Sequence, residues 1–437
     1  MSIVFPLPAI IKLILVFALV LVAIRRKISL GNAFLIGAVV LGLIFGLGPA
    51  PMSTSMVSSI FYPKTLMLSV IVSLILVLSN SMESSGHMRK LLNSFKGLVT
   101  NPRLNLIIFP ALIGLLPMPG GAVFSAPMVK ELGAGTGLKP DHLSYVNYWF
   151  RHIWEYWWPL YPGVLLAITM ADVSLGSFVL FLWPLTIVAL GIGYQPIKRF
   201  HVFSAVERVG ERPSVRPFLQ ELSPILIVIV FGLGLGEILS LSYPEFTVSK
   251  ETGLVIALCL AIFLVWRIND LDLSRIWNII ADRTLLSMIY MVFTILIFKG
   301  ILEDSHAVAA ISTELAIMHI PLWVIAIVLP FMVGSVVGIT IAFVGSTFPI
   351  LIPLISSFNE MQFLLPYLML SLVSGFVGVI LSPLHLCLLL SNKYFGARLI
   401  DVYRHLCTPS AVILCAGIGY FWIAKTVLQY FHIYIGE

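Results

Sequence analysis

Four side chains able to bind an anion or move a proton gather in one strongly apolar stretch. Asn147, Arg151, His152 and Glu155 lie within about two and a half turns of a helix. An ionisable group at the centre of a membrane costs about 2.5 to 3.5 kcal/mol, so such a group needs a partner or a function. Arginine offers a planar fork that suits a carboxylate, and a His/Glu pair in low dielectric can change protonation near neutral pH. We therefore expect Arg151 to bind an anionic substrate or hold Glu155, while His152 and Glu155 carry a coupling proton.

A structural alternative accounts for the same residues. Residues 147–152 could be interfacial, with Arg151 and Glu155, four residues apart, forming an ion pair beneath an aromatic belt. The belt would consist of Trp149, Trp154, Trp157 and Trp158. In either case Pro159 and Pro162 remove backbone donors, which leaves carbonyl groups free to coordinate a cation.

Composition places these residues in a membrane. The chain has 437 residues, of which 59% are hydrophobic and 11% charged, and its mean hydropathy is +1.04. A water-soluble protein would carry about 25% charged residues, so we expect an all-α polytopic membrane protein. The net charge of +6 is then a sign of topology, with no nucleic-acid partner expected. The four cysteines have neither disulfide nor zinc spacing, and no cofactor or metal is expected.

Apolar runs give the expected spans. A bilayer core of about 30 Å needs about 20 apolar residues in a helix. Ten stretches meet this criterion: 3–24, 30–48, 65–85, 143–170, 174–196, 219–241, 252–267, 284–302, 362–391 and 406–430. Two further apolar stretches, 103–131 and 321–358, are broken by Pro117–Gly121 and by the region 338–349. Their arms are too short to cross comfortably, so we expect re-entrant hairpins.

The basic residues set the orientation. Ten crossings place both termini outside, and most of the 26 Lys and Arg residues then lie in cytoplasmic loops. Only Lys64 and Lys250 lie in the external loops. The positive-inside rule therefore favours this orientation, in a plasma (inner) membrane. Because the apolar run 3–24 is too long for a signal peptide and its charges follow it, we expect a retained first span.

The chain contains an internal repeat. We expect a first repeat at 1–196, a cytoplasmic linker at 197–217 and a second repeat at 218–437. Offsets of 220 and then 224 residues align Glu83 with Glu303, Pro110 with Pro330, Gly114 with Gly334, and Pro159 with Pro383. Each repeat has five crossings, an odd number, so the second must be inverted. Inverted repeats with interrupted helices indicate a secondary transporter with its site at the membrane midplane.

The hairpin tips extend the candidate site. Irregular backbone inside a membrane persists only where it lines a cavity, and helix N-termini there attract anions. Gly120 and Gly121 permit close backbone approach, and Ser346 or Thr347 could cap the second hairpin's return helix. Turn geometry and simple capping are the alternative explanations.

The second broken span adds further candidates. Ser382 could contact the ligand, and His385 is either a second titrating group or a core histidine. The expected substrate contacts are Gly120, Gly121, Asn147, Arg151, Gly345, Ser346, Thr347 and Ser382. The expected ion-coupling residues are His152, Glu155 and His385.

This architecture resembles a known superfamily. The order of three spans, a hairpin, a broken span and a closing span, repeated in inverted form, is similar to the ion-transporter superfamily of divalent-anion/sodium symporters and gluconate, lactate and citrate permeases. The stretches 117–122 and 151–159 look like a prokaryotic integral-membrane branch of it. The resemblance implies a homodimer with a scaffold and a moving transport part. Sodium-coupled dicarboxylate members carry Ser-Asn-Thr at both tips, whereas this chain has Pro119-Gly120-Gly121 and Gly345-Ser346-Thr347.

The favoured function is secondary active transport of a small organic anion, coupled to H⁺ in preference to Na⁺. A sodium-coupled symporter and a channel or non-transporting membrane protein remain alternatives. The chain has no H-E-x-x-H motif, no obvious Ser/His pair on adjoining spans and no P-loop, so we do not expect an enzyme.

Overall fold

The computed structural model describes residues 7–118, 120–134, 136–198, 213–243 and 245–435. Pro119, in the expected first hairpin turn, and residues 199–212 of the expected linker lie outside these ranges. Within them every regular element is a helix. Eight of the described helical stretches are long and apolar enough to cross a membrane, or nine if one bent pair forms a single span. These helices confirm the expectation of an all-α, multi-pass membrane protein.

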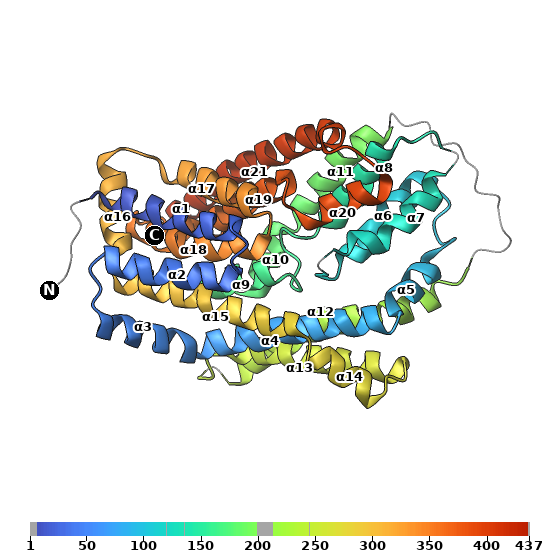
Figure 1. Ribbon diagram of the computed structural model, residues 1–437, viewed down its shortest axis with the longest axis horizontal. Helices are drawn as coiled ribbons and strands as arrows, with labels where there is room; N and C mark the ends of the chain where they lie inside the picture. Colours follow the sequence, from blue (N-terminus) through green and yellow to red (C-terminus); the bar gives the residue numbers. More distant parts are fainter. Residues whose placement is uncertain (1–6, 119, 135, 199–212, 244, 436–437) are drawn as a thin grey trace.

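The helices follow one another along the chain as Figure 1 shows. Those before residue 199 are α1 (Ala9–Arg25), α2 (Leu30–Ile44), α3 (Pro49–Phe61), α4 (Pro63–Ser84), α5 (His87–Phe95), α6 (Pro102–Gly114), α7 (Ala122–Gly133), α8 (Pro140–Trp149), the 3₁₀ helix η1 (Phe150–His152), α9 (Pro162–Ala171), α10 (Leu175–Leu182) and α11 (Pro184–Lys198). Those after residue 212 are α12 (Arg216–Ser242), α13 (Ser249–Ile268), α14 (Leu273–Ile280), α15 (Arg283–Asp304), α16 (Ala307–Ile317), α17 (Leu322–Val337), α18 (Thr340–Ser357), η2 (Met361–Phe363), α19 (Leu364–Leu381), α20 (Leu386–Phe395) and α21 (Leu399–Ile435).

Helices lie within all ten expected crossings, but one of the eight long stretches is α18, an arm of the expected second hairpin that has 18 residues and is thus longer than expected. The first two, α1 and α2, have 17 and 15 residues and are shorter than the eight long stretches. The expected crossings 143–170 and 362–391 are each broken, into α8, η1 and α9 and into η2, α19 and α20. Short helices α3, α5, α14 and α16 were not expected. They are too short or too polar to register as spans; α5, for example, buries only the face that carries Met88, Leu91 and Phe95.

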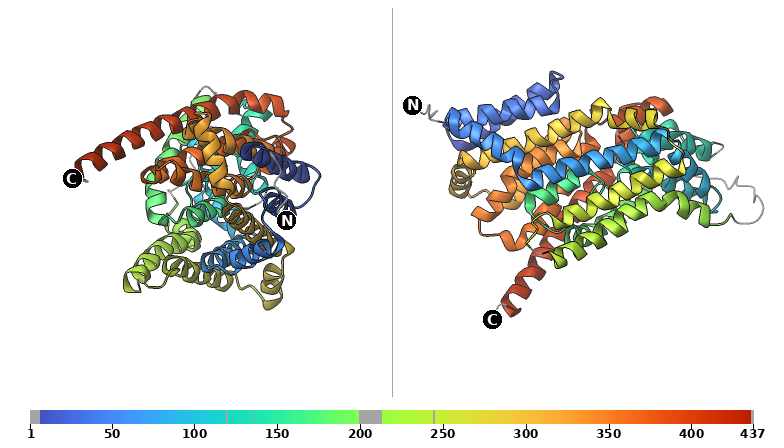
Figure 2. Two further views of the ribbon diagram at one scale, coloured as in Figure 1. Left: turned by 90° about the vertical axis from the view of Figure 1, so that its left-hand side faces the viewer. Right: turned by 90° about the horizontal axis from the view of Figure 1, so that it is seen from below.

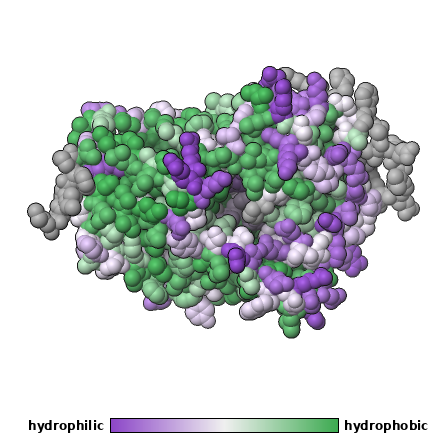
Figure 3. Space-filling model, viewed as in Figure 1, coloured by the Kyte–Doolittle hydropathy of each residue, from purple (hydrophilic) through white to green (hydrophobic). Residues whose placement is uncertain are grey.

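Long helices form one side of the molecule. In Figure 1 and the right-hand view of Figure 2, α4, α12, α13 and α15 run alongside one another with similar directions. Opposite them lie the long α21 and several shorter helices, with α6, α7, α8 and α20 toward one end and α17 and α18 toward the other. In Figure 3 apolar side chains cover much of the visible face, and hydrophilic ones gather at the end that holds α5 to α7.

The N-terminal helix is fastened to a distant part of the chain. The first amide groups of a helix have no partner within it. Here the Glu314 carboxylate on α16 accepts from the backbone N–H groups of Ala9 at 2.6 Å and Ile10 at 2.8 Å. A negative charge at this end also complements the helix dipole, so Glu314 both caps α1 and fixes it against α16.

Small residues let α12 and α13 pack closely. A Cβ atom at Gly253 would lie 2.3 Å from the backbone nitrogen of Gly236, so the two backbones touch. Close approach of this kind is the usual basis of helix pairing in membranes, where burial of apolar surface gives no extra drive.

We predict that Gly253→Ala lowers the melting temperature of the detergent-purified protein, because overpacking a tight contact costs about 1 to 3 kcal/mol. The matched control is Gly234→Ala on α12, where an added Cβ meets nothing within 4 Å. That change should leave the melting temperature equal or higher, since alanine favours a helix over glycine. Equal melting temperatures for the two variants would contradict the packing argument.

Candidate functional site

Four interruptions of helices meet in the interior. They are the turn between α6 and α7, the segment from η1 to the start of α9, the short link between α17 and α18, and the link between α19 and α20. Gly338, with φ +69°, ends α17 in the left-handed conformation that glycine adopts readily. The side chains and carbonyl that come together there belong to Met118, Arg151, His152, Glu155, Thr340, His385 and Cys387.

Arg151 is buried and keeps one hydrogen-bond donor unpaired among the described residues. It is 2% exposed, and its Nη2 donates to the carbonyl of Met118 at 2.7 Å. Its Nη1 lies 3.4 Å from His152 Nε2 and 3.6 Å from Cys387 Sγ. Its Nε has no hydrogen-bond partner among the described residues. Burying an unused donor of a charged group is costly, so this position favours an additional acceptor.

Gly121 lies directly against this guanidinium group. A Cβ at Gly121 would be 2.3 Å from Arg151 Nη2, so a side chain here would displace the guanidinium. The neighbouring Gly120 has φ +72° and lies against Leu390, where a Cβ would come within 2.9 Å of Cδ1. Both glycines therefore serve turn geometry and close approach, and Gly121 also bounds the site.

A chain of titratable side chains runs beside Arg151. His152 Nδ1 is 2.6 Å from the carbonyl of Tyr148, and because a carbonyl only accepts, Nδ1 holds the ring proton of neutral His152. The lone pair on its Nε2 then faces His385 Nε2 at 3.1 Å and Glu155 Oε1 at 3.7 Å. The other carboxylate oxygen of Glu155 accepts from Thr340 Oγ1 at 2.9 Å. These contacts connect both broken segments of the chain through groups that can hold protons.

The expected ion pair between Arg151 and Glu155 is wrong. The two described side chains form no ion pair with each other; Glu155 lies against His152 and Thr340 instead. The expectation relied on α-helical spacing. The α-helix ends at Trp149 and continues as a 3₁₀ turn, so residues four apart no longer share a face.

The four tryptophans of the expected aromatic belt all donate to acceptors within the protein. Trp154 Nε1 donates to the carbonyl of Ala111 and Trp158 Nε1 to that of Leu115, both at 2.8 Å, while the Tyr161 hydroxyl donates to Gly114 at 2.7 Å. Trp149 and Trp157 likewise donate to acceptors on α11. The first three groups satisfy carbonyls at the C-terminal end of α6, where the helix supplies no further amide donors.

Asn147 and Ser382 lie near the site but are used structurally. The Asn147 amide donates to the Ala122 carbonyl at 2.9 Å and to Ser391 at 2.6 Å, and it accepts from Ser125 at 2.6 Å. It therefore joins α8 to α7 and α20. The Ser382 hydroxyl accepts a hydrogen bond from the backbone N–H of Leu384 in the same loop, with 3.3 Å between Leu384 N and Ser382 Oγ.

Gly345, Ser346 and Thr347 are not at a helix break. All three lie inside α18, and the two hydroxyl groups donate to carbonyls one turn earlier. The expectation that Ser346 or Thr347 caps the return helix is wrong, because the break occurs at Gly338, before Thr340. Proline and hydroxyl residues within α18 are accommodated without ending the helix.

Two site residues escaped the sequence analysis. Thr340 is the first residue of α18 and contacts Glu155, and Cys387 contacts Arg151. A threonine just after a glycine break was a usable signal, whereas a cysteine in an apolar run was not. The Cys387 sulfur and the nearer nitrogens of His152 and His385 lie within 4.8 Å of one another, a spacing compatible with metal binding. The adjacent Arg151 charge opposes a cation there, so the centre suits an anion better.

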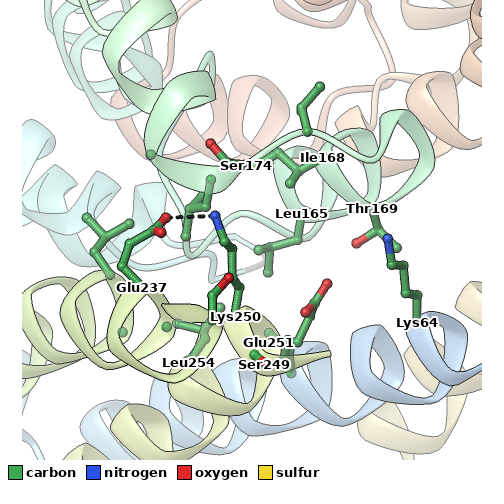
Figure 4. Close-up of a pocket in the computed structure, with 18 of the residues that line it drawn as sticks. Lys64, Leu165, Ile168, Thr169, Ser174, Glu237, Ser249, Lys250, Glu251 and Leu254 are labelled. Atoms are coloured by element: carbon green, nitrogen blue, oxygen red, sulfur yellow. Dashed lines mark hydrogen bonds and ion pairs between the residues drawn. The ribbon is translucent and has the colours of Figure 1, made fainter. Parts of the chain in front are cut away.

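A cavity opens away from the residues around Arg151, and Figure 4 shows its charged lining. It has a volume of about 380 Å³ and lies among α4, α9, α12 and α13. Both lysines expected in external loops line it. Lys64 pairs with Asp172, and Lys250 pairs with Glu237 at 2.9 Å. Because each lysine already has an acidic partner, this cavity is a weaker candidate for anion binding than the region around Arg151.

Comparison with known proteins identifies a family. No curated protein matches the chain. The sequence profile of a family described as "Protein of unknown function (DUF401)" matches residues 9–428. The match runs from the first residue of α1 into the last turns of α21 and so includes every residue of the central site. The chain therefore belongs to the DUF401 family.

Proposed function

We propose that the protein is a secondary active transporter of a small organic anion, a carboxylate, coupled to H⁺ and working by alternating access. The observation that carries this proposal is Arg151: a buried guanidinium group with an unused Nε donor, at the meeting point of four helix interruptions. A carboxylate could accept from that donor and neutralise the charge.

We propose that α6–α7 and α17–α18 are the re-entrant hairpins of two inverted repeats. In Figure 1 the two pairs lie toward opposite ends of the molecule. Equivalent contacts support the repeat. A Cβ at Gly114 would lie 2.1 Å from the carbonyl oxygen of Arg151, and a Cβ at Gly334 would lie 2.1 Å from the carbonyl oxygen of Gly375. Gly334 is 220 residues after Gly114, and Gly375 is 224 residues after Arg151. A second pair of contacts shows the same equivalence. Trp154 donates to the carbonyl of Ala111, and Gly378, which the 224-residue offset aligns with Trp154, lies against the carbonyl of Phe331, which the 220-residue offset aligns with Ala111.

The remaining parts of the proposal follow from the arrangement of charge. Glu155, His152 and His385 form the suggested proton path, since they are connected and lie beside the anion-binding donor. We also propose both termini outside a prokaryotic inner membrane, a homodimer, and membership of the ion-transporter superfamily. Sodium coupling is the second candidate, because carbonyl groups freed near Pro159 and Pro162 could hold a cation.

The test is uptake into proteoliposomes. A pooled panel of monocarboxylates, sugar acids, dicarboxylates and tricarboxylates is offered under an imposed pH gradient, with and without Na⁺, and internal anions are measured by mass spectrometry. Accumulation that an uncoupler abolishes and that ignores Na⁺ supports the proposal. Accumulation that requires Na⁺ would show that the coupling ion is Na⁺ and not H⁺. Ohmic conductance without exchange identifies a channel, and no transport of any anion contradicts the anion site.

We predict that Arg151→Lys weakens the apparent anion affinity about tenfold, because lysine keeps the charge but loses the planar fork of donors. The measurement is the concentration dependence of uptake. Arg275→Lys on the exposed surface of α14 is the matched control and should have no effect. An unchanged affinity in the Arg151 variant would leave Arg151 with a packing role only.

We predict that Glu155→Gln abolishes accumulation driven by the pH gradient and keeps part of the exchange of internal for external anion. Glutamine can still accept from Thr340 but cannot carry a proton at this position. Glu303→Gln, which alters a half-exposed acid paired with Lys299, is the control and should accumulate normally. If the Glu155 variant accumulates anion like the parent, the proton-carrier role is wrong.

A further inference from the structure

Three metal-ligating side chains meet where α8 begins and α21 begins. Asp141 and His142 lie in the first turn of α8, and His405 lies in the second turn of α21. Asp141 Oδ2 is 2.9 Å from His405 Nε2 and 4.0 Å from His142 Nε2. The three donor atoms lie within 4.8 Å of one another, and the two imidazole rings are 4.8 Å apart between centroids. This cluster is separate from the residues around Arg151.

We propose that Asp141, His142 and His405 form a binding site for a divalent transition-metal cation of the zinc class. Two imidazole nitrogens and one carboxylate oxygen are donors that Zn²⁺ and its neighbours prefer, and three protein ligands leave a position open for water. With bonds of about 2.0 to 2.2 Å, ligand atoms around a tetrahedral ion lie about 3.3 to 3.6 Å apart. The observed 2.9 and 4.0 Å bracket that range, so small side-chain rotations complete the site.

The cluster is accessible. The side chains of Asp141 and His142 are each 19% exposed and that of His405 is 22% exposed, so an ion can enter without unfolding. The ring of Tyr145 packs against His405, with 6.0 Å between ring centroids, and limits its movement. The site is thus half-buried and partly preorganised.

The charge state suits a cation. Asp141 Oδ2 accepts a hydrogen bond from His405 Nε2, so an acceptor oxygen already lies between the two imidazole rings. Two arginines in the same part of the chain are already engaged: Arg398 and Arg404 pair with Asp401 at 2.7 and 3.4 Å. The positive charge that does face His142 is Lys139.

Binding requires two local adjustments: His405 Nε2 must give up the proton that it donates to Asp141, and His142 must move its ring proton to Nδ1. The backbone N–H of Lys139 lies 3.4 Å from His142 Nδ1, which is a long hydrogen bond. When His142 Nε2 binds an ion, the ring proton moves to Nδ1 and this contact is given up. The bound ion then ties the helix that leads to Arg151 to α21. This inference goes beyond the proposed transport function and does not depend on it.

The experiment measures binding directly. Full-length protein without a histidine tag is purified in detergent, equilibrium dialysis against Zn²⁺ gives stoichiometry and affinity, and Co²⁺ absorption reports the ligands. We expect one ion per chain, no sulfur-to-cobalt charge-transfer band, and an affinity that falls at least about tenfold in Asp141→Asn and His405→Gln. Cys387→Ser and His319→Asn, an exposed histidine outside the cluster, should bind as the parent does.

Several results overturn the proposal. They are no retained Zn²⁺, an unchanged affinity in His405→Gln, and a thiolate charge-transfer band that disappears in Cys387→Ser, which would place the ion in the interior. Melting temperatures measured without metal show whether each variant folds. If His405→Gln does not fold, His142→Gln serves as the test, since it removes a second imidazole ligand at the opposite helix of the cluster, in the first turn of α8.

Discussion

Helix ends placed inside an apolar interior must find partners for their backbone groups, and this constraint governs the centre of the molecule. An unpaired carbonyl or amide costs several kcal/mol where there is no water. The end of α6 is satisfied by Trp154, Trp158 and Tyr161, which belong to the interruption between η1 and α9. One break in the chain therefore supplies the caps for another. These hydrogen bonds stabilise both interruptions, and the charged residues of the site lie beside them.

Close contact between backbones is the second consequence. Because α6 must approach the chain around Arg151, position 114 has no room for a side chain, and Gly121 leaves just enough space for the guanidinium group. The second half solves the same problem with Gly334 against Gly375. The site thus rests on close main-chain contacts, and the Arg151 side chain is held by a carbonyl, a sulfur and a ring nitrogen.

Much of the fold was predictable from hydropathy and from proline and glycine positions. Long apolar runs located the spans, and Pro117 and Pro159 marked two of the interruptions. The grouping of His152 with His385 depended on the repeat, and the two rings do meet. Local spacing failed where geometry changed: the 3₁₀ turn separated Arg151 from Glu155, and a left-handed Gly338 ended α17 earlier than the polar residues of α18 suggested. The amphipathic α14 and the buried Cys387 carry no signal in a hydropathy profile.

The cap on α1 bears on how the protein is made. Glu314 follows Ala9 by 305 residues, yet it supplies the partner for the first amides of the first helix. Chains emerge from the ribosome N-terminus first. The start of α1 is therefore synthesised 305 residues before the side chain that caps it. These amides gain their partner late, and the newly made protein must tolerate or shield that open helix end in the meantime.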